Sequence, residues 1–482
     1  MATSDPGEFS FFWHDYETFG RVPRRDRPAQ FAGVRTDAAL NEIDAPVMQY
    51  CAPADDYLPE PEACLLTGIT PQHCLAHGLP EHAFAAAVEA QLARPGTVGV
   101  GYNSIRFDDE VTRFLFWRNL IDPYAREWRL GCGRWDLLDV VRVTRALRPE
   151  GITWPNHPDG KPSLKLEDLT AANGLAHDAA HDALSDVRAT IALARLVKSR
   201  QPRLWDFCLK LRRKEAVLDE IGSGRPFLHV SGMYAPERGC LAVVWPLAPH
   251  PTNRNEIIVW DLSADPAQLD GLDAAQLRER MFTRADALPE GVARLPVKTL
   301  HVNKSPVVVG NLATLTPAVA ERWGLDLAAV QRHAQQAPQH AAAVAGRWAE
   351  VFARPAPDTP PDVDEDLYGG FVGNTDRGRL ERLRALPPQQ LAGARTGFDD
   401  PRLAELLFRY RARNFPATLD EEERARWHEH RAARLHGGAG GTLTLQAFFD
   451  RIDALNEGAD ERGQAILEAL YDHAEQIAPD AP

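Results

Sequence analysis

The sequence predicts a mixed α/β domain, followed by a small β-rich domain and then a helical domain. Strand-like and amphipathic helical segments alternate up to about residue 200, short strand-like segments dominate residues 226–310, and helical patterns fill the chain beyond residue 370. We therefore expect a first domain over residues 9–200, a second over 201–355 and a third over 356–482.

The first domain begins with an antiparallel meander. Its strand-like segments are residues 9–17, 29–37 and 46–53, joined by polar turns that contain proline. Helical patterns follow at 81–93, 109–120 and 182–200, and the apolar segment 97–103 lies between the first two. This succession predicts a meander that continues into alternating strands and helices.

The two later domains have different patterns. Short strands are expected at 227–232, 240–247 and 255–262, and helices at 403–415, 422–435 and 462–477. Between them, residues 354–370 are rich in proline and aspartate, which is typical of a linker.

Composition excludes several classes of protein. With 482 residues, 44% of them hydrophobic and 25% charged, the chain is globular rather than disordered. A net charge of −14 argues against a protein that coats nucleic acid by bulk attraction. The sequence has neither a signal-peptide pattern nor an apolar run long enough to span a bilayer, so we expect a cytoplasmic protein with no membrane partner. The six cysteines form no C-x-x-C pair and should be reduced packing residues.

Carboxylates gather at the ends of predicted elements in the first domain. In FFWHDYETFG, Asp15 and Glu17 lie two positions apart on a strand and therefore share a face. Asp108 follows the apolar segment 97–103 and opens a helix, and His181 and Asp186 lie near the start of another helix. Taken singly, these residues could be a solvated pair, a helix N-cap, a first-turn histidine and a surface aspartate.

One joint explanation is simpler than four separate ones. Two-metal phosphodiester hydrolysis requires several anionic oxygens to hold two divalent ions about 3.5 to 4 Å apart. Hard oxygen ligands favour Mg²⁺, with Mn²⁺ as the alternative, and the cations would offset repulsion between the carboxylates. A histidine with an ordinary pKa of about 6.5 can accept a proton from the attacking water at neutral pH. A zinc site at His177 and His181 is disfavoured because no further ligands are suitably spaced, and His14, His157 and His177 are expected to be surface residues or to bond locally.

Three motifs support this interpretation through a resemblance. DYE, YNSIRFDDE and HDALSD resemble, in order and spacing, the motifs of the DEDDh 3′→5′ exonucleases. Further segments along nearly the whole chain, among them DRPAQFA, RWDLLDV, LRPEGI, HVSGM and YRARNFP, resemble the exodeoxyribonuclease I family. The resemblance implies a ribonuclease H-like exonuclease domain, an SH3-like domain and a helical C-terminal domain. It also implies processive release of 5′-mononucleotides from the 3′ end of single-stranded DNA with Mg²⁺, in DNA repair and recombination.

The resemblance also implies roles for individual residues. Asp15, Glu17, Asp108 and Asp186 match the metal-binding positions, His181 matches the general base, and Glu17 would also meet the terminal nucleotide. Lys165 stands where the family typically has an arginine, so it keeps the charge for a phosphate contact but loses the bidentate fork. Further contacts to the DNA strand are expected from basic and stacking side chains, namely Arg113, Tyr124, Trp128, Arg142 and Lys214.

The same resemblance suggests binding partners, and the motifs leave alternative functions open. The resemblance implies a monomer that binds the C-terminal tail of single-stranded-DNA-binding protein, with Arg148 as a candidate contact. The motifs do not separate this function from that of an RNA-trimming or proofreading DEDDh exonuclease, although small RNA-trimming relatives lack the long extension after the nuclease domain. An inactive nucleic-acid-binding scaffold is the third alternative, disfavoured because all five catalytic positions hold competent residue types.

Overall fold

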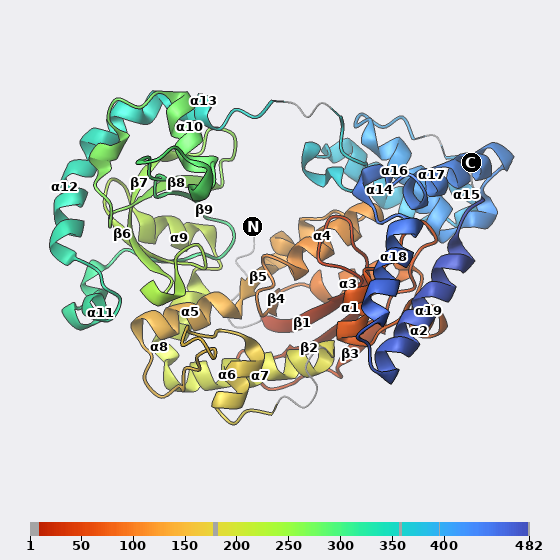
Figure 1. Ribbon diagram of the computed structural model, residues 1–482, viewed down its shortest axis with the longest axis horizontal. Coiled ribbons are helices and arrows are strands. Elements are labelled where there is room, and N and C mark those ends of the chain that lie inside the picture. Colours follow the sequence, from red (N-terminus) through yellow and green to blue (C-terminus); the bar gives the residue numbers. More distant parts are fainter. Residues whose placement is uncertain (1–8, 177–181, 356–358, 395, 481–482) are drawn as a thin grey trace. The chain divides into compact units, whose positions relative to one another are not determined.

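The computed structural model describes residues 9–176, 182–355, 359–394 and 396–480. The chain divides into two compact units, one formed by residues 1–133, 177–188 and 357–482 and the other by residues 134–176 and 189–356. Figure 1 shows the elements of both units in the colours of the sequence. The predicted domain boundaries stay a prediction, because these units group residues by their contacts and not by their order in the chain.

The first unit contains a sheet in which β3, β2, β1 and β4 are neighbours in that order. Strands β1 and β2 pair antiparallel, as do β2 and β3, whereas β1 and β4 are parallel. This arrangement confirms the predicted meander and its continuation into a parallel strand. The strands are β1 Ser10–Thr18, β2 Pro28–Thr36, β3 Val47–Tyr50 and β4 Thr97–Gly101. The helices are α1 Pro61–Thr67, α2 Pro71–His77, α3 Glu81–Leu92, α4 Asp108–Arg118, α14 Asn374–Arg384, α15 Pro388–Leu391, α16 Arg402–Asn414, α17 Glu421–Leu435, α18 Leu445–Asn456 and α19 Glu461–Ile477.

The second unit contains an antiparallel sheet with the order β10-β6-β7-β8-β9, which confirms the predicted β-rich segment. Its strands are β6 Phe227–Val230, β7 Leu241–Pro249, β8 Glu256–Asp261, β9 Val297–His301 and β10 Val307–Val309. The remaining strand and α-helices of the described residues are β5 Gly133–Asp136, α5 Leu137–Leu147, α6 Leu166–Ala172, α7 Ala183–Arg200, α8 Pro202–Lys210, α9 Lys214–Ile221, α10 Ala274–Phe282, α11 Pro317–Arg322, α12 Leu327–Val344 and α13 Trp348–Val351.

The helices at the end of the chain share hydrophobic cores with its first strands. Phe19 and Tyr57 lie in one buried cluster with Leu435, Phe448 and Leu470. Helices α18 and α19 accordingly lie beside α1 (Figure 1). A second buried cluster joins aromatic residues of α4 to leucines of α14 and α16. The C-terminal helices therefore form one compact body with the sheet that carries the predicted carboxylates.

The predicted linker needs a partial correction. The boundary between the two units, at residue 356, falls within residues 354–370. Asp364, however, is buried, and its carboxylate forms ion pairs with Arg413, Arg409 and Arg27. The second half of this acidic segment is thus fixed by arginines, which sequence reading could not show because those arginines lie elsewhere in the chain.

Candidate active site

Strand β1 places Asp15 and Glu17 on one face of the sheet. The side chains of His14 and Tyr16 are buried on the other face. Phe12 and Tyr16 belong to a buried apolar cluster that holds the strand in place. Alternation along the strand then directs Asp15 and Glu17 to the opposite face. The register of the pairing with β2 shifts between Glu17 and Thr18, and such bulges often re-aim side chains beside active sites.

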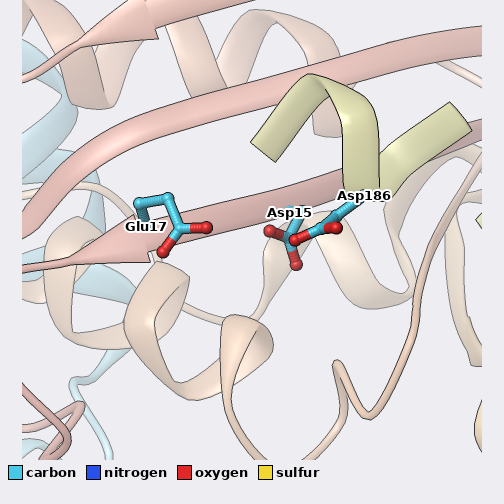
Figure 2. A group of neighbouring side chains, drawn as sticks. All are labelled: Asp15, Glu17 and Asp186. Carbon is cyan, nitrogen blue, oxygen red and sulfur yellow. The ribbon is translucent and has the colours of Figure 1, made fainter. Parts of the chain in front are cut away.

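Three of the predicted carboxylates meet. Asp15, Glu17 and Asp186 each offer an oxygen, and these oxygens all lie within 4.8 Å of one another. Figure 2 shows Asp15 and Asp186 pointing toward each other, with Glu17 from the same strand beside them. Asp186 comes from the first turn of α7, 169 positions after Glu17, so the fold and not the sequence brings the group together.

Asp108 reaches the same strand by a different contact. It is the first residue of α4 rather than its N-cap, which is Phe107. An oxygen of its carboxylate accepts a hydrogen bond of 3.2 Å from the backbone N–H of Tyr16, the residue between Asp15 and Glu17. The alternative of a simple N-cap is therefore wrong. The fourth predicted carboxylate touches the strand that carries the first two.

The two acidic residues that follow Asp108 are engaged elsewhere. Asp109 is buried and pairs with Arg126 at 2.6 Å, and Glu110 pairs with Arg113 at 2.8 Å. The first ion pair ties α4 to Arg126, which follows the helix in the chain, and the second lies within α4 itself. In the run Asp108-Asp109-Glu110, the structure thus separates one carboxylate at the sheet from two that stabilise the helix.

The cluster carries a strong electrostatic penalty in the metal-free protein. Burial, with the negative charges of Asp108, Glu17 and Asp186 nearby, raises the pKa of Asp15 well above its ordinary value. Burial, with Asp186 and Asp108, raises the pKa of Glu17 to about 8. Like charges held this close disfavour ionisation unless a cation offsets them. Several hard oxygen donors around one point fit a divalent cation such as Mg²⁺ or Mn²⁺.

Sequence reading missed Asp182 and Gln30. Asp182 also raises the pKa values of Asp15 and Glu17, so it lies near the cluster, but it does not belong to the group that could hold a metal ion. Both residues line a polar cavity of about 210 Å³ in the first unit. The other residues that line it are Tyr50, Thr67, Gly68, Ile69 and His73. An aspartate at the start of a predicted helix was a usable signal for Asp182, whereas nothing in the sequence marked Gln30.

The predictions for His14, His177 and His181 have different outcomes. His181, the predicted general base, lies outside the described residues, as does His177. His14 was expected at the surface or in a local hydrogen bond, and this is wrong. Its ring is buried, neither ring nitrogen has a hydrogen-bond partner in the part of the chain that the structure describes, and burial lowers its pKa to about 4. His14 is therefore a packing residue behind the carboxylates.

The predicted DNA-contact residues of the first unit differ in exposure. Trp128 has an exposed side chain, at 62%. Arg113 is buried, and its guanidinium donates to Glu127, Glu110 and the Tyr368 hydroxyl. It also lies over the ring of Tyr124, 5.2 Å from the centroid. The Trp128 side chain is thus accessible to a DNA strand, whereas the contacts of Arg113 that the structure describes are with other residues of the protein.

The predicted contact residues of the second unit have local partners. Lys165 pairs with Glu167 at 3.2 Å on the surface, and Arg142 pairs with Asp139 at 2.6 Å. The Lys214 ammonium donates to the Asn255 side chain, and Arg148 is exposed. All four roles stay predictions.

Family models cover most of the chain. The model described as Exonuclease matches residues 12–194, that of the Exonuclease I SH3-like domain matches 212–354, and that of the Exonuclease I C-terminal domain matches 361–477. The fold class predicted from the sequence, an exonuclease domain followed by an SH3-like and a C-terminal domain, is confirmed.

Full-length relatives agree with these matches. The chain is 46% identical to exodeoxyribonuclease I of Escherichia coli, over 99% of this chain and 100% of the relative. An exonuclease I structure from the moderate thermophile Methylocaldum szegediense is 50% identical, has a TM-score of 0.91, and aligns over 97% of this chain and 99% of that one. The E. coli exonuclease I structure with a dA16 oligonucleotide is 45% identical, has a TM-score of 0.92, and aligns over 98% and 100%.

Two further neighbours contain a metal ion or a protein partner. One is a zinc-bound form of an E. coli exonuclease I complex with single-stranded DNA, and the other is SSB/exonuclease I with an inhibitor. They are 44% identical to this chain, with TM-scores of 0.90 and 0.89.

Proposed function

This chain belongs to the exodeoxyribonuclease I family and is a nuclease, and from this premise we propose that it degrades single-stranded DNA from the 3′ end by metal-dependent hydrolysis. The observation that carries the proposal is the meeting of the Asp15, Glu17 and Asp186 carboxylates within 4.8 Å. Neither a scaffold nor a simple binding module has a use for such a costly group of acids.

The proposed chemistry assigns a task to each of the five residues. Asp15, Glu17, Asp108 and Asp186 would hold two Mg²⁺ ions, with Mn²⁺ as a substitute. When bound, the ions supply Lewis-acid stabilisation of the charge that develops on the phosphate oxygens. His181 would accept the proton of the attacking water, and Glu17 would also meet the terminal nucleotide. Successive cycles would release 5′-mononucleotides.

We also propose the finer properties of substrate and partner. Relatives have been solved with single-stranded DNA and with SSB, which supports single-stranded DNA as the substrate and SSB as a partner of this chain. An exposed aromatic residue such as Trp128 suits stacking on unpaired bases. Processive action, a monomeric state, contact with the SSB tail through Arg148 and a role in DNA repair and recombination belong to the same proposal.

The test is nucleotide release from matched single-stranded DNA, duplex DNA and single-stranded RNA, each labelled at either end. The proposal expects rapid release from the 3′ end of single-stranded DNA with Mg²⁺ and none with a chelator. Faster release from RNA would keep the site but overturn the substrate. No release from any of the three would overturn the enzymatic proposal.

A further inference from the structure

Gln30 is a buried glutamine in the sheet beside the carboxylates. Strand pairing sets it directly opposite Glu17 on β1 and opposite Tyr50 on β3. Residues opposite one another in neighbouring strands share a face, so these three side chains form one row. Gln30 is only 1% exposed, and a polar amide that is buried to this extent needs hydrogen-bond partners.

Two of its four partners in the described residues lie at the start of α7, and the other two are Tyr50 and the Met48 sulfur on β3. The side-chain oxygen of Gln30 accepts a hydrogen bond of 3.2 Å from the backbone N–H of Ala183, the first residue of the helix. Its amide nitrogen lies 3.4 Å from a carboxylate oxygen of Asp182 and 3.3 Å from the Tyr50 hydroxyl. One side chain of β2 therefore engages both residues at which α7 begins.

The same turn of α7 carries Asp186. Asp182 caps the helix, because its carboxylate accepts from the Ser185 N–H at 3.1 Å. Its carbonyl accepts from the Asp186 N–H at 3.0 Å. The sheet is thus connected to Asp186 by the Gln30 amide, the Asp182 helix cap and the hydrogen bond from the Asp186 N–H to the Asp182 carbonyl. All of these lie within the first unit.

We propose that Gln30 is a positioning residue for this active site. It fixes the start of α7 to β2, so that the Asp186 carboxylate meets those of Asp15 and Glu17. This inference rests on the proposed function, since it assigns Gln30 a task in aligning the proposed metal ligands. Partners that orient metal ligands commonly contribute about 10- to 100-fold to activity or metal affinity when they are removed.

Glutamine is the residue type that both contacts require. Ala183 needs an acceptor and Asp182 needs a donor, and an amide side chain of this length offers both from one planar group at any pH and without a charge. A glutamate would keep the acceptor but set a further negative charge beside Asp182 and Glu17. A methionine would keep the volume but leave the Ala183 N–H and the Asp182 carboxylate short of partners.

The first experiment replaces Gln30 with methionine and measures hydrolysis of single-stranded DNA at a series of Mg²⁺ concentrations. We expect kcat to fall about 10-fold or more and KM for DNA to change less than about 2-fold. The Mg²⁺ concentration that gives half-maximal activity should rise. Gln49→Met is the matched control and should behave as wild type. Gln49 lies on β3 next to Tyr50, so its side chain points to the other face of the sheet.

A double-mutant cycle tests the route of the effect. If Gln30 acts through the start of α7, Gln30→Met should cost much less in an Asp182→Ala background than in wild type. If the methionine variant folds poorly, the same measurement is made with Gln30→Glu, which keeps the size of the side chain and its hydrogen-bond acceptor. Additive losses, or a kcat per folded molecule equal to wild type, would overturn the positioning role. An inactive wild-type protein would instead point to failure of the proposed function.

Discussion

Replacing Glu17 with glutamine should stabilise the metal-free protein at alkaline pH while abolishing its activity. Burial and the neighbouring carboxylates raise the pKa of Glu17 from the ordinary 4.5 to about 8, so the folded protein favours the protonated acid. Because its pKa is raised, the contribution of Glu17 to stability is complete below pH 4.5 and is lost as the pH rises to about 8. A glutamine has no proton to lose and escapes this cost.

The size of the effect follows from the pKa. Each pH unit between the unfolded and folded values is worth about 1.4 kcal/mol, which gives a few kcal/mol for Glu17 as an upper limit. The side chain is only 9% exposed, so solvent screens little of it. For a chain of this length, we expect a gain in Tm of a few °C above pH 8 and almost none at pH 5.

Thermal unfolding in chelator and in Mg²⁺, at steps from pH 5 to pH 9, measures this prediction. Wild type should gain more Tm from Mg²⁺ than Glu17→Gln, and the difference should widen with pH, because binding of the ion requires the ionised carboxylates. Glu468→Gln, an exposed position on α19, is the control for loss of one negative charge. A pH-independent gain, or no gain in chelator at pH 8.5, would refute the reasoning.

Three other changes test separate parts of the structure. His181→Ala should keep Mg²⁺ and DNA binding but lose most turnover, and unchanged turnover in a single-nucleotide release assay would remove it as the base. Trp128→Ala should raise KM for single-stranded DNA with little change in kcat, and an unchanged KM would exclude a stacking role. Arg413→Ala removes one arginine partner from each of the buried carboxylates of Asp364 and Asp56 and should lower the free energy of unfolding in urea by up to about 3 to 5 kcal/mol, whereas the exposed Arg424→Ala should not.

Local patterns predicted the elements of the site well. The alternation in FFWHDYETFG predicted the strand, and the strand then directed Asp15 and Glu17 to one face. The choice of Asp108 over Asp109 and Glu110 came from its place at the start of the predicted helix and from the family motif. It depends physically on Arg126 and Arg113, which engage the second and third acids, and on the Tyr16 N–H, which engages the first.

Contacts between distant segments were beyond sequence reading. Gln30 meets Ala183 across 153 positions, and Arg413 meets Asp56 across 357. Neither pair has a local pattern, since a buried glutamine and a surface glutamine look alike in a sequence. Arg113 shows that a residue type alone does not give its surroundings, because a basic side chain expected to face DNA is buried among Glu127, Glu110 and Tyr368, and its DNA contact stays a prediction.

The C-terminal helices pack against the end of the strand that carries Asp15 and Glu17. Phe19 lies two residues after Glu17 and is buried in the same cluster as Leu435, Phe448 and Leu470. The Tyr57 hydroxyl donates to the Phe19 carbonyl at 3.1 Å, which fixes the chain where β1 ends. Removing the helices would expose these side chains to water and loosen the end of the strand that aims Glu17. The long extension therefore contributes to the packing of the strand that carries Asp15 and Glu17.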